Sequence, residues 1–73
     1  MILDSEKERF IYILDILNKK CKGLFTQNEL TTYLNVSRPT IAKLQNGKSF
    51  DFWLLSRYAD LLGMEIKFKI NLK

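Results

Sequence analysis

The chain contains no histidine, the side chain that enzymes most often use as a general base and proteins most often use as a metal ligand. With one cysteine, Cys21, it can form neither an intrachain disulfide nor a cysteine-based zinc site. Its three scattered glycines make no glycine-rich phosphate-binding loop. No apolar run reaches the length of a membrane span, and the first residues do not resemble a signal peptide. We therefore expect a cytoplasmic protein that is not an enzyme and has no metal, cofactor or membrane partner.

What the chain does contain is a globular composition with an uneven distribution of charge. Of its 73 residues, 47% are hydrophobic and 27% are charged, which is typical of one small folded domain. Residues 1–18 carry two basic and four acidic side chains, a net charge of −2. Residues 19–48 carry six basic side chains and one acidic, a net charge of +5. The positive segment suits an anionic partner such as nucleic acid, with a solvated basic face that binds nothing as the alternative.

Hydrophobic spacing predicts a longer helix on either side of this basic segment. The first covers about residues 5–21, and Cys21 lies on its apolar stripe as a small core residue. The other follows Asp51, which is a suitable N-cap, and stops at Gly63. The expected core-facing residues of the two helices are Phe10, Ile13, Leu14, Leu17, Cys21, Phe52, Leu55, Ala59 and Leu62.

Two short helices with well-marked ends are expected between the longer ones. A Thr-x-x-Glu capping box opens the first of them, and it ends near Leu34. A serine cap and an early proline open the second, which ends at an Asn-Gly pair. The residues that mark these ends are Thr26, Glu29, Asn35, Ser37, Pro39, Asn46 and Gly47. Together the pair predicts a helix-turn-helix, whose second helix exposes Arg38, Thr40 and Lys43 to the DNA major groove.

Residues 64–73 change to strict alternation of apolar and polar side chains, which predicts a half-buried β-strand. Its apolar face consists of Met64, Ile66, Phe68, Ile70 and Leu72. A lone strand must find a partner, and the nearest is the same strand of a second copy, with the apolar faces covering Tyr12 and Ile16. Pairing within the chain to residues 1–3 is the alternative, but that segment is too short to satisfy the strand. We therefore expect a DNA-binding domain over residues 1–63, closed by a dimerisation strand over residues 64–73.

The order of these motifs resembles a known family. The motifs are Thr26-Gln27-x-Glu29-Leu30, Leu34-x-Val36-Ser37-Arg38-x-Thr40-Ile41-x-x-Leu44-x-Asn46-Gly47 and Leu55-x-x-Tyr58-Ala59-x-x-Leu62-Gly63. They resemble the lambda-repressor-like Cro/Xre family of helix-turn-helix proteins over about residues 8–63. A closing strand after Gly63 is similar to the HipB-type antitoxin branch, whose subunits pair through such strands. The chain departs from the family pattern at Thr31 and Asn35, where a small residue and a glycine are usual.

The resemblance implies a homodimer that binds double-stranded DNA at an inverted repeat and regulates transcription. By position, Arg38 and Lys43 would reach guanine acceptors, and Pro39 and Thr40 would contact a thymine methyl group. Contacts to the sugar-phosphate backbone would come from Gln27, Ser37, Asn46 and Lys48. Gln27 would also brace Arg38. Ser37 caps its helix with or without DNA, and a solubilising charge is the alternative for Lys48.

A second interpretation is an antitoxin that binds a partner toxin and autoregulates its own promoter. Trp53 favours a protein contact, because it falls beside the core-facing stripe of its helix and exposed aromatic side chains are typical of contact surfaces. The alternative for Trp53 is a partly buried side chain that covers the dimer seam.

Overall fold

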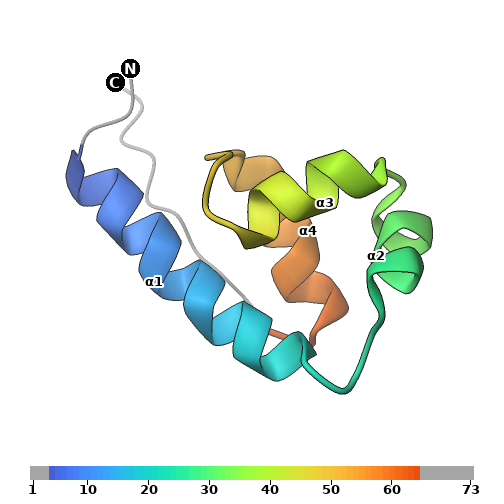
Figure 1. Cartoon of the computed structure of the whole chain (residues 1–73). Helices are drawn as coiled ribbons and strands as arrows, with labels where there is room; N and C mark the ends of the chain where they lie inside the picture. The colour runs from blue at the N-terminus through green and yellow to red at the C-terminus, as the bar shows by residue number, and fades with distance from the viewer. Residues whose placement is uncertain (1–3, 65–73) are drawn as a thin grey trace.

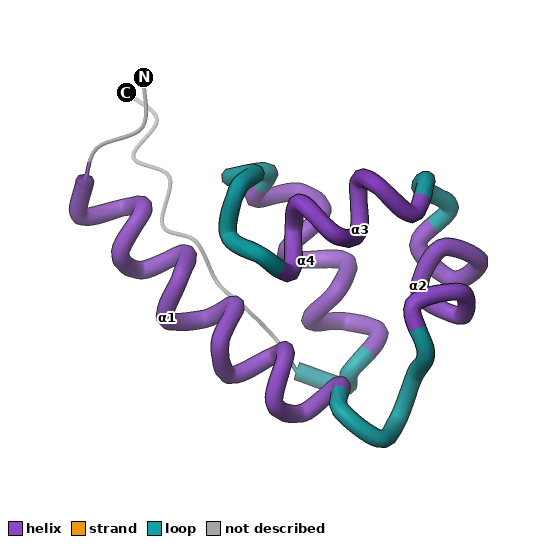
Figure 2. The backbone as a smooth tube through the Cα atoms, in the orientation of Figure 1, coloured by secondary structure: helices purple, strands orange, loops and turns teal. Residues whose placement is uncertain are grey.

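The computed structural model describes residues 4–64, and this part of the chain forms four α-helices. Their bounds are Asp4–Cys21 for α1, Gln27–Leu34 for α2, Arg38–Gln45 for α3 and Phe52–Leu61 for α4. The long α1 forms one side of the molecule, and the three shorter helices gather beside it (Figure 1). Short loops connect the helices (Figure 2). The predicted mainly α architecture with four helices is confirmed for these residues.

One hydrophobic core unites the four helices. Its buried side chains are Phe10, Leu14, Leu17, Cys21, Leu30, Leu34, Ile41, Leu44, Leu54, Leu55, Tyr58, Ala59 and Leu62. The ring of Phe10 makes edge contacts with the rings of Phe50 and Phe52, at centroid distances of 5.2 and 5.1 Å. These contacts tie α1 to the start of α4, since edge-to-face aromatic pairs add to the stabilisation from burial.

The predicted core positions of α1 and α4 are largely confirmed. Seven of the nine are buried, and Ile13 and Phe52 are half-buried against the core. Leu54 and Tyr58 are also buried, although the sequence did not place them on the stripe of α4. Because α4 packs against both α1 and α2, its buried side is wider than a single stripe.

The ends of α2 follow the predicted capping chemistry. The backbone N–H of Glu29 donates to Thr26 Oγ1 at 3.2 Å, and the Thr26 N–H donates to Glu29 Oε1 at 2.8 Å. Both bonds of the capping box are therefore present. After α2, Asn35 adopts the left-handed conformation with φ +55°, and its N–H donates to the carbonyl of Thr31. An asparagine tolerates this conformation better than most side chains, so it serves here in place of glycine.

The ends of α3 and α4 are also capped by the predicted side chains. Ser37 Oγ accepts from the N–H of Thr40 at 3.4 Å, and Asp51 Oδ1 accepts from the N–H of Leu54 at 3.0 Å. After α3 the chain turns at Gly47, whose φ is +70°. A Cβ at this position would lie 2.7 Å from Cδ1 of Ile11, so α1 approaches this turn closely.

The end of α4 corrects one detail of the predicted strand. Gly63 has φ +74° and donates to the carbonyl of Asp60 at 3.0 Å, and the N–H of Met64 donates to the carbonyl of Ala59 at 2.8 Å. This is the hydrogen-bond pattern of a Schellman cap. Met64, predicted as the first strand residue, therefore belongs to the helix end, and its side chain is half-buried against the core. The other predicted dimerisation residues, Ile66, Phe68, Ile70 and Leu72, lie outside the described residues, as do residues 1–3.

Candidate nucleic-acid interface

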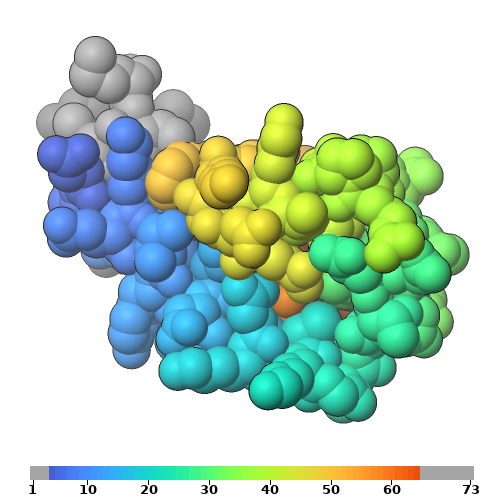
Figure 3. Space-filling view, viewed as in Figure 1, coloured from blue at the N-terminus to red at the C-terminus, as the bar shows by residue number. Residues whose placement is uncertain are grey.

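α3 has one side in the core and the opposite side in solvent. Its inward side chains, Ile41 and Leu44, are fully buried, whereas Arg38, Pro39 and Lys43 are exposed. In the space-filling view, α3 forms the upper edge of the molecule beside α2 (Figure 3). We call the predicted DNA-binding residues the α3 surface; they are Gln27, Ser37, Arg38, Pro39, Thr40, Lys43, Asn46 and Lys48. Gln27 and Thr40 are half-buried and the other six are exposed.

The first residues of α2 and α3 are joined by a hydrogen bond. Nη2 of Arg38 donates to Oε1 of Gln27 at 3.3 Å, which confirms the predicted bracing contact. This bond gives the exposed arginine side chain one contact with α2 while using one of its five N–H donors. The remaining donors can form the paired hydrogen bonds that recognise a guanine edge.

The hydroxyl groups of Ser37 and Thr40 at the start of α3 form a hydrogen bond with each other. Ser37 Oγ lies 2.8 Å from Thr40 Oγ1, and it also accepts from the Thr40 backbone. The γ-methyl group of Thr40 is then the part of this side chain suited to an apolar contact. That arrangement fits the predicted contact with a thymine methyl group.

The residues after α3 have ordered backbones and exposed side chains. The N–H of Asn46 donates to the carbonyl of Ala42 at 3.0 Å, and the N–H of Lys48 donates to that of Lys43 at 2.9 Å. The side chains of Asn46 and Lys48 both extend into solvent. An amide and an ammonium group held in this way can reach the backbone of a bound duplex without further ordering of the main chain.

Some basic side chains of the positive segment 19–48 lie at the end of α1 and interact with α1 itself. Nζ of Lys19 lies 3.0 Å from Oδ2 of Asp15, and both side chains are well exposed. Lys19 and Lys20 occupy the last turn of α1, where cations interact favourably with the helix dipole. On the α3 surface itself, the charged side chains are Arg38, Lys43 and Lys48.

Three polar residues that the sequence interpretation missed meet at the C-terminal end of α3. Nδ2 of Asn18 donates to the backbone carbonyl of Gln45 at 2.9 Å, and the hydroxyl of Tyr58 donates to Oδ1 of Asn18 at 3.0 Å. Nε2 of Gln45 lies 3.4 Å from the Tyr58 hydroxyl and completes the cluster. We call Asn18, Gln45 and Tyr58 the polar triad. The sequence offers only a weak signal for this cluster. An Asn next to lysines is typical of a solvent-exposed position, and a Tyr next to leucines is typical of the core.

Tyr58 is fully buried within this triad. Burial raises the pKa of its hydroxyl well above the ordinary value, and the neighbouring Cys21 acts in the same direction. The hydrogen bond from Gln45 lowers the pKa and opposes part of this shift. The hydroxyl therefore stays protonated and acts as a donor to Asn18 over the whole physiological range.

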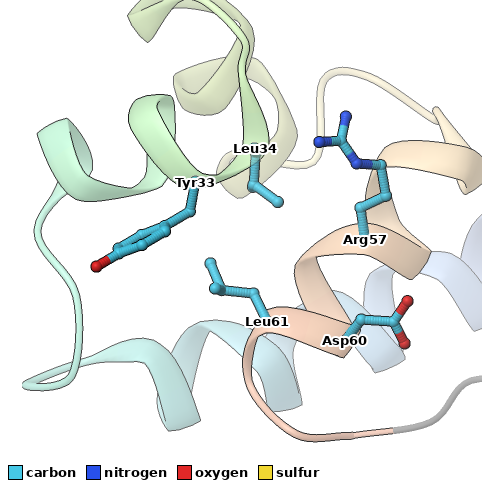
Figure 4. Close-up of a pocket in the computed structure, with 5 residues that line it drawn as sticks. All are labelled: Tyr33, Leu34, Arg57, Asp60 and Leu61. Carbon is cyan, nitrogen blue, oxygen red and sulfur yellow. The ribbon is translucent and has the colours of Figure 1, made fainter.

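A shallow pocket of about 320 Å³ lies between α2 and α4 and shares no residue with the α3 surface. It is lined by Tyr33, Leu34, Arg57, Asp60 and Leu61. Leu34 and Leu61 face each other across it, while the Tyr33 hydroxyl points away (Figure 4). Nothing in this arrangement pairs a nucleophile with a base.

Several large apolar side chains are solvent-exposed in the single chain. Trp53 is 75% exposed at the start of α4, and Tyr12 and Ile16 on α1 are 69% and 37% exposed. The predicted positions of all three off the core-facing stripes are therefore confirmed. The described part of its own chain leaves most of the Trp53 side chain uncovered.

Within residues 4–64, no helix is long and apolar enough to cross a bilayer. The same residues contain no group of three or more potential metal ligands. Comparisons of the chain with protein-family models, curated proteins and solved structures gave no match.

Proposed function

We propose that the chain is a sequence-specific DNA-binding regulator of transcription of the lambda-repressor-like Cro/Xre type. In this proposal α2, residues 35–37 and α3 are the helix-turn-helix, and α3 enters the major groove. The observation that carries it is the position of Arg38, which is exposed in the first turn of α3 and braced by Gln27 at 3.3 Å. An exposed arginine with one such contact contributes little to folding but keeps donors suited to reading a base pair.

Some residues of the α3 surface contact base edges, and the others contact the sugar-phosphate backbone. Arg38 and Lys43 donate to guanine N7 and O6, while Pro39 and Thr40 lie against a thymine methyl group. The remaining residues set the position on the duplex through its sugar-phosphate backbone, and they are Gln27, Ser37, Asn46 and Lys48. Phosphate contacts of this kind make the affinity fall with rising salt.

A dimer is part of the proposal. Residues 65–73 of two copies pair as antiparallel strands about a two-fold axis, which gives a lone strand the partner it needs. Tyr12 and Ile16 support this arrangement, because both are exposed in the single chain and are available for the second copy to cover. Two reading helices would then face successive major grooves about 34 Å apart, so the operator is an inverted repeat with that spacing.

Selection of binding sites from random duplex DNA tests the proposal and identifies the operator in the same experiment. We expect an inverted repeat to be enriched. Fluorescence anisotropy at two salt concentrations should then show tight, salt-dependent binding of two chains per selected site. Equal and weak binding to selected and scrambled DNA would refute sequence-specific recognition and leave only a basic surface.

A second candidate function is that of an antitoxin which binds a toxin protein and represses its own promoter. Trp53 and Tyr33 favour it, because they are 75% and 57% exposed and aromatic side chains are enriched at protein interfaces. Expression of the neighbouring reading frame with and without this chain tests it. Growth arrest that this chain relieves would support the antitoxin, and a neighbour without toxicity would contradict it.

A further inference from the structure

α3 is a short helix with few apolar anchors. It has eight residues, and its buried side chains are Ile41 and Leu44, which lie one turn apart. Two buried side chains on one side of a helix set how closely it packs against the core. They resist rotation of the helix about the line that joins them only weakly. Such a rotation would carry Arg38 and Lys43 sideways, and hydrogen bonds to a base edge tolerate only small displacements. A restraint on this rotation would therefore sharpen the reading of DNA by this helix.

The polar triad supplies a restraint at the C-terminal end of α3. The carbonyl of Gln45 is one of the last four carbonyls of the helix, which have no partner within a regular α-helix. Asn18 of α1 donates to it at 2.9 Å, and Tyr58 of α4 orients Asn18 by donating to its Oδ1 at 3.0 Å. The end of α3 is thereby linked to two other helices. Since the Tyr58 side chain is fully buried, its hydroxyl has one well-defined direction.

We propose that Asn18 and Tyr58 are positioning residues for DNA reading, which hold α3 at the angle that its exposed side chains need. The inference rests on the proposed function. The bond between Arg38 and Gln27 restrains the first turn of α3, and the polar triad restrains its last turn. Neither Asn18 nor Tyr58 touches DNA in this arrangement, so both act through α3.

The ratio of affinities for the selected site and for scrambled DNA separates positioning from folding. A variant that is partly unfolded loses affinity for both DNAs by the same factor, so the ratio does not change. A variant whose α3 is free to rotate keeps its phosphate contacts with scrambled DNA but loses the base contacts at the selected site. A positioning role therefore lowers the ratio.

The variants are Asn18→Ala, which removes both bonds of Asn18, and Tyr58→Phe, which removes one of them. From the usual strength of one or two hydrogen bonds, we expect the ratio to fall about tenfold for Asn18→Ala and about threefold for Tyr58→Phe. Tyr33→Phe is the matched control, because it removes a tyrosine hydroxyl that is exposed on α2, outside both the α3 surface and the proposed dimer seam. Gln45→Ala keeps the backbone carbonyl that Asn18 binds and removes only the 3.4 Å contact with Tyr58, so it should lower the ratio less than Asn18→Ala does. The Tyr33→Phe control should keep the wild-type ratio, and an unchanged ratio for Asn18→Ala would overturn the inference.

Amide hydrogen exchange provides a readout that does not depend on DNA. The N–H groups of Asn46, Gly47 and Lys48 bond back into the last turn of α3, so they report how firmly that turn is held. We expect Asn18→Ala to accelerate their exchange several-fold relative to the N–H of Leu30 in α2. If the wild type selects no DNA site, the proposed function fails, and these exchange rates alone decide the role of the triad. Unchanged exchange would then show that the triad does not hold α3.

Discussion

Arg38 is the residue whose position supports the proposed function most directly. Its guanidinium is positioned by Gln27 and keeps donors free for a base edge. Replacing it with alanine should lower the affinity for the selected DNA site by about 1–3 kcal/mol and relax the preference at one base pair. Anisotropy titrations with single-base variants of the site measure both effects.

Lys48→Ala is the matched comparison for Arg38→Ala, because it removes one exposed cation close to the end of α3. As a phosphate contact, Lys48 should contribute equally to every DNA sequence, and its loss should reduce the salt slope by about 1. Should both substitutions weaken selected and scrambled DNA alike, Arg38 would have no role in base recognition.

Gly47 combines a left-handed backbone with a close neighbour. We expect Gly47→Ala to lower the free energy of unfolding by about 1–2 kcal/mol, chiefly because φ is +70°. The contact of the new Cβ with Ile11 should add at most about 1 kcal/mol, since Cδ1 is the far end of a side chain that is 42% exposed. Urea unfolding measures the change.

Gly23→Ala separates the two effects at Gly47. Gly23 has φ +85° and no atom within 4 Å of an added Cβ, so this variant carries backbone strain alone. Adding Ile11→Val to Gly47→Ala removes the crowding methyl group and should bring the loss close to that of Gly23→Ala. A loss at Gly47 that persists unchanged in the double variant would show that Ile11 plays no part.

Because the Tyr58 hydroxyl is buried, we expect the free energy of unfolding to fall at alkaline pH. Because burial raises its pKa in the folded chain above the unfolded value of about 10, the unfolded state loses this proton first as the pH rises. The contribution of this proton to the free energy of unfolding is fully present below pH ~10. Above that value it should decline by about 1.4 kcal/mol per pH unit. Comparing urea unfolding of the wild type and Tyr58→Phe between pH 9 and 11 should show a shallower decline in the variant. Equal slopes would contradict the prediction.

At the scale of the helices, capping determines where each short element begins. Removing the Thr26 side chain should destabilise the protein by about 1 kcal/mol, because the N–H of Glu29 loses its acceptor. Thermal and urea unfolding of Thr26→Ala would measure this loss. Glu29→Gln is the control, since glutamine also completes a capping box and should leave stability nearly unchanged. A stable Thr26→Ala protein would mean that water replaces the cap.

The helices were predictable because their signals are local. The capping box at Thr26, the serine cap at Ser37 and the left-handed Asn35 each involve residues within a few positions of one another. Their chemistry is the same in a peptide and in a folded protein. The exposed side of α3 was predictable for the same reason, since helical periodicity separates it from Ile41 and Leu44.

Contacts between distant parts of the chain were not predictable in this way. Asn18 and Gln45 are 27 positions apart, and Asn18 and Tyr58 are 40 apart. No local pattern marks such a contact, and its partners become evident only once the helices have packed. At Met64 a local pattern was present but incomplete as a guide. Its position fits the alternation of a strand, whereas its N–H takes part in the cap of α4.

At the scale of the whole molecule, a chain of this size has a small core, and a dimer interface would add to its stability. The melting temperature should then rise with protein concentration. Phe68→Asp should abolish this dependence and yield a monomer in sedimentation experiments, because a carboxylate cannot be buried in the apolar seam. Lys69→Glu, on the opposite face of the predicted strand, should leave the dimer intact. A dimer that survives Phe68→Asp would exclude the strand as its interface.

The way in which α3 is held has a consequence for how such a protein can change during evolution. Its interior side depends on Ile41, Leu44 and a main-chain carbonyl of Gln45, none of which takes part in base recognition under the proposed function. A carbonyl is present whatever side chain a mutation introduces. Substitutions at exposed positions such as Pro39 or Lys43 therefore leave the attachment of the helix intact. Under the proposed function, descendants of this chain could acquire new operator sequences one codon at a time, while the residues that hold α3 stay unaltered.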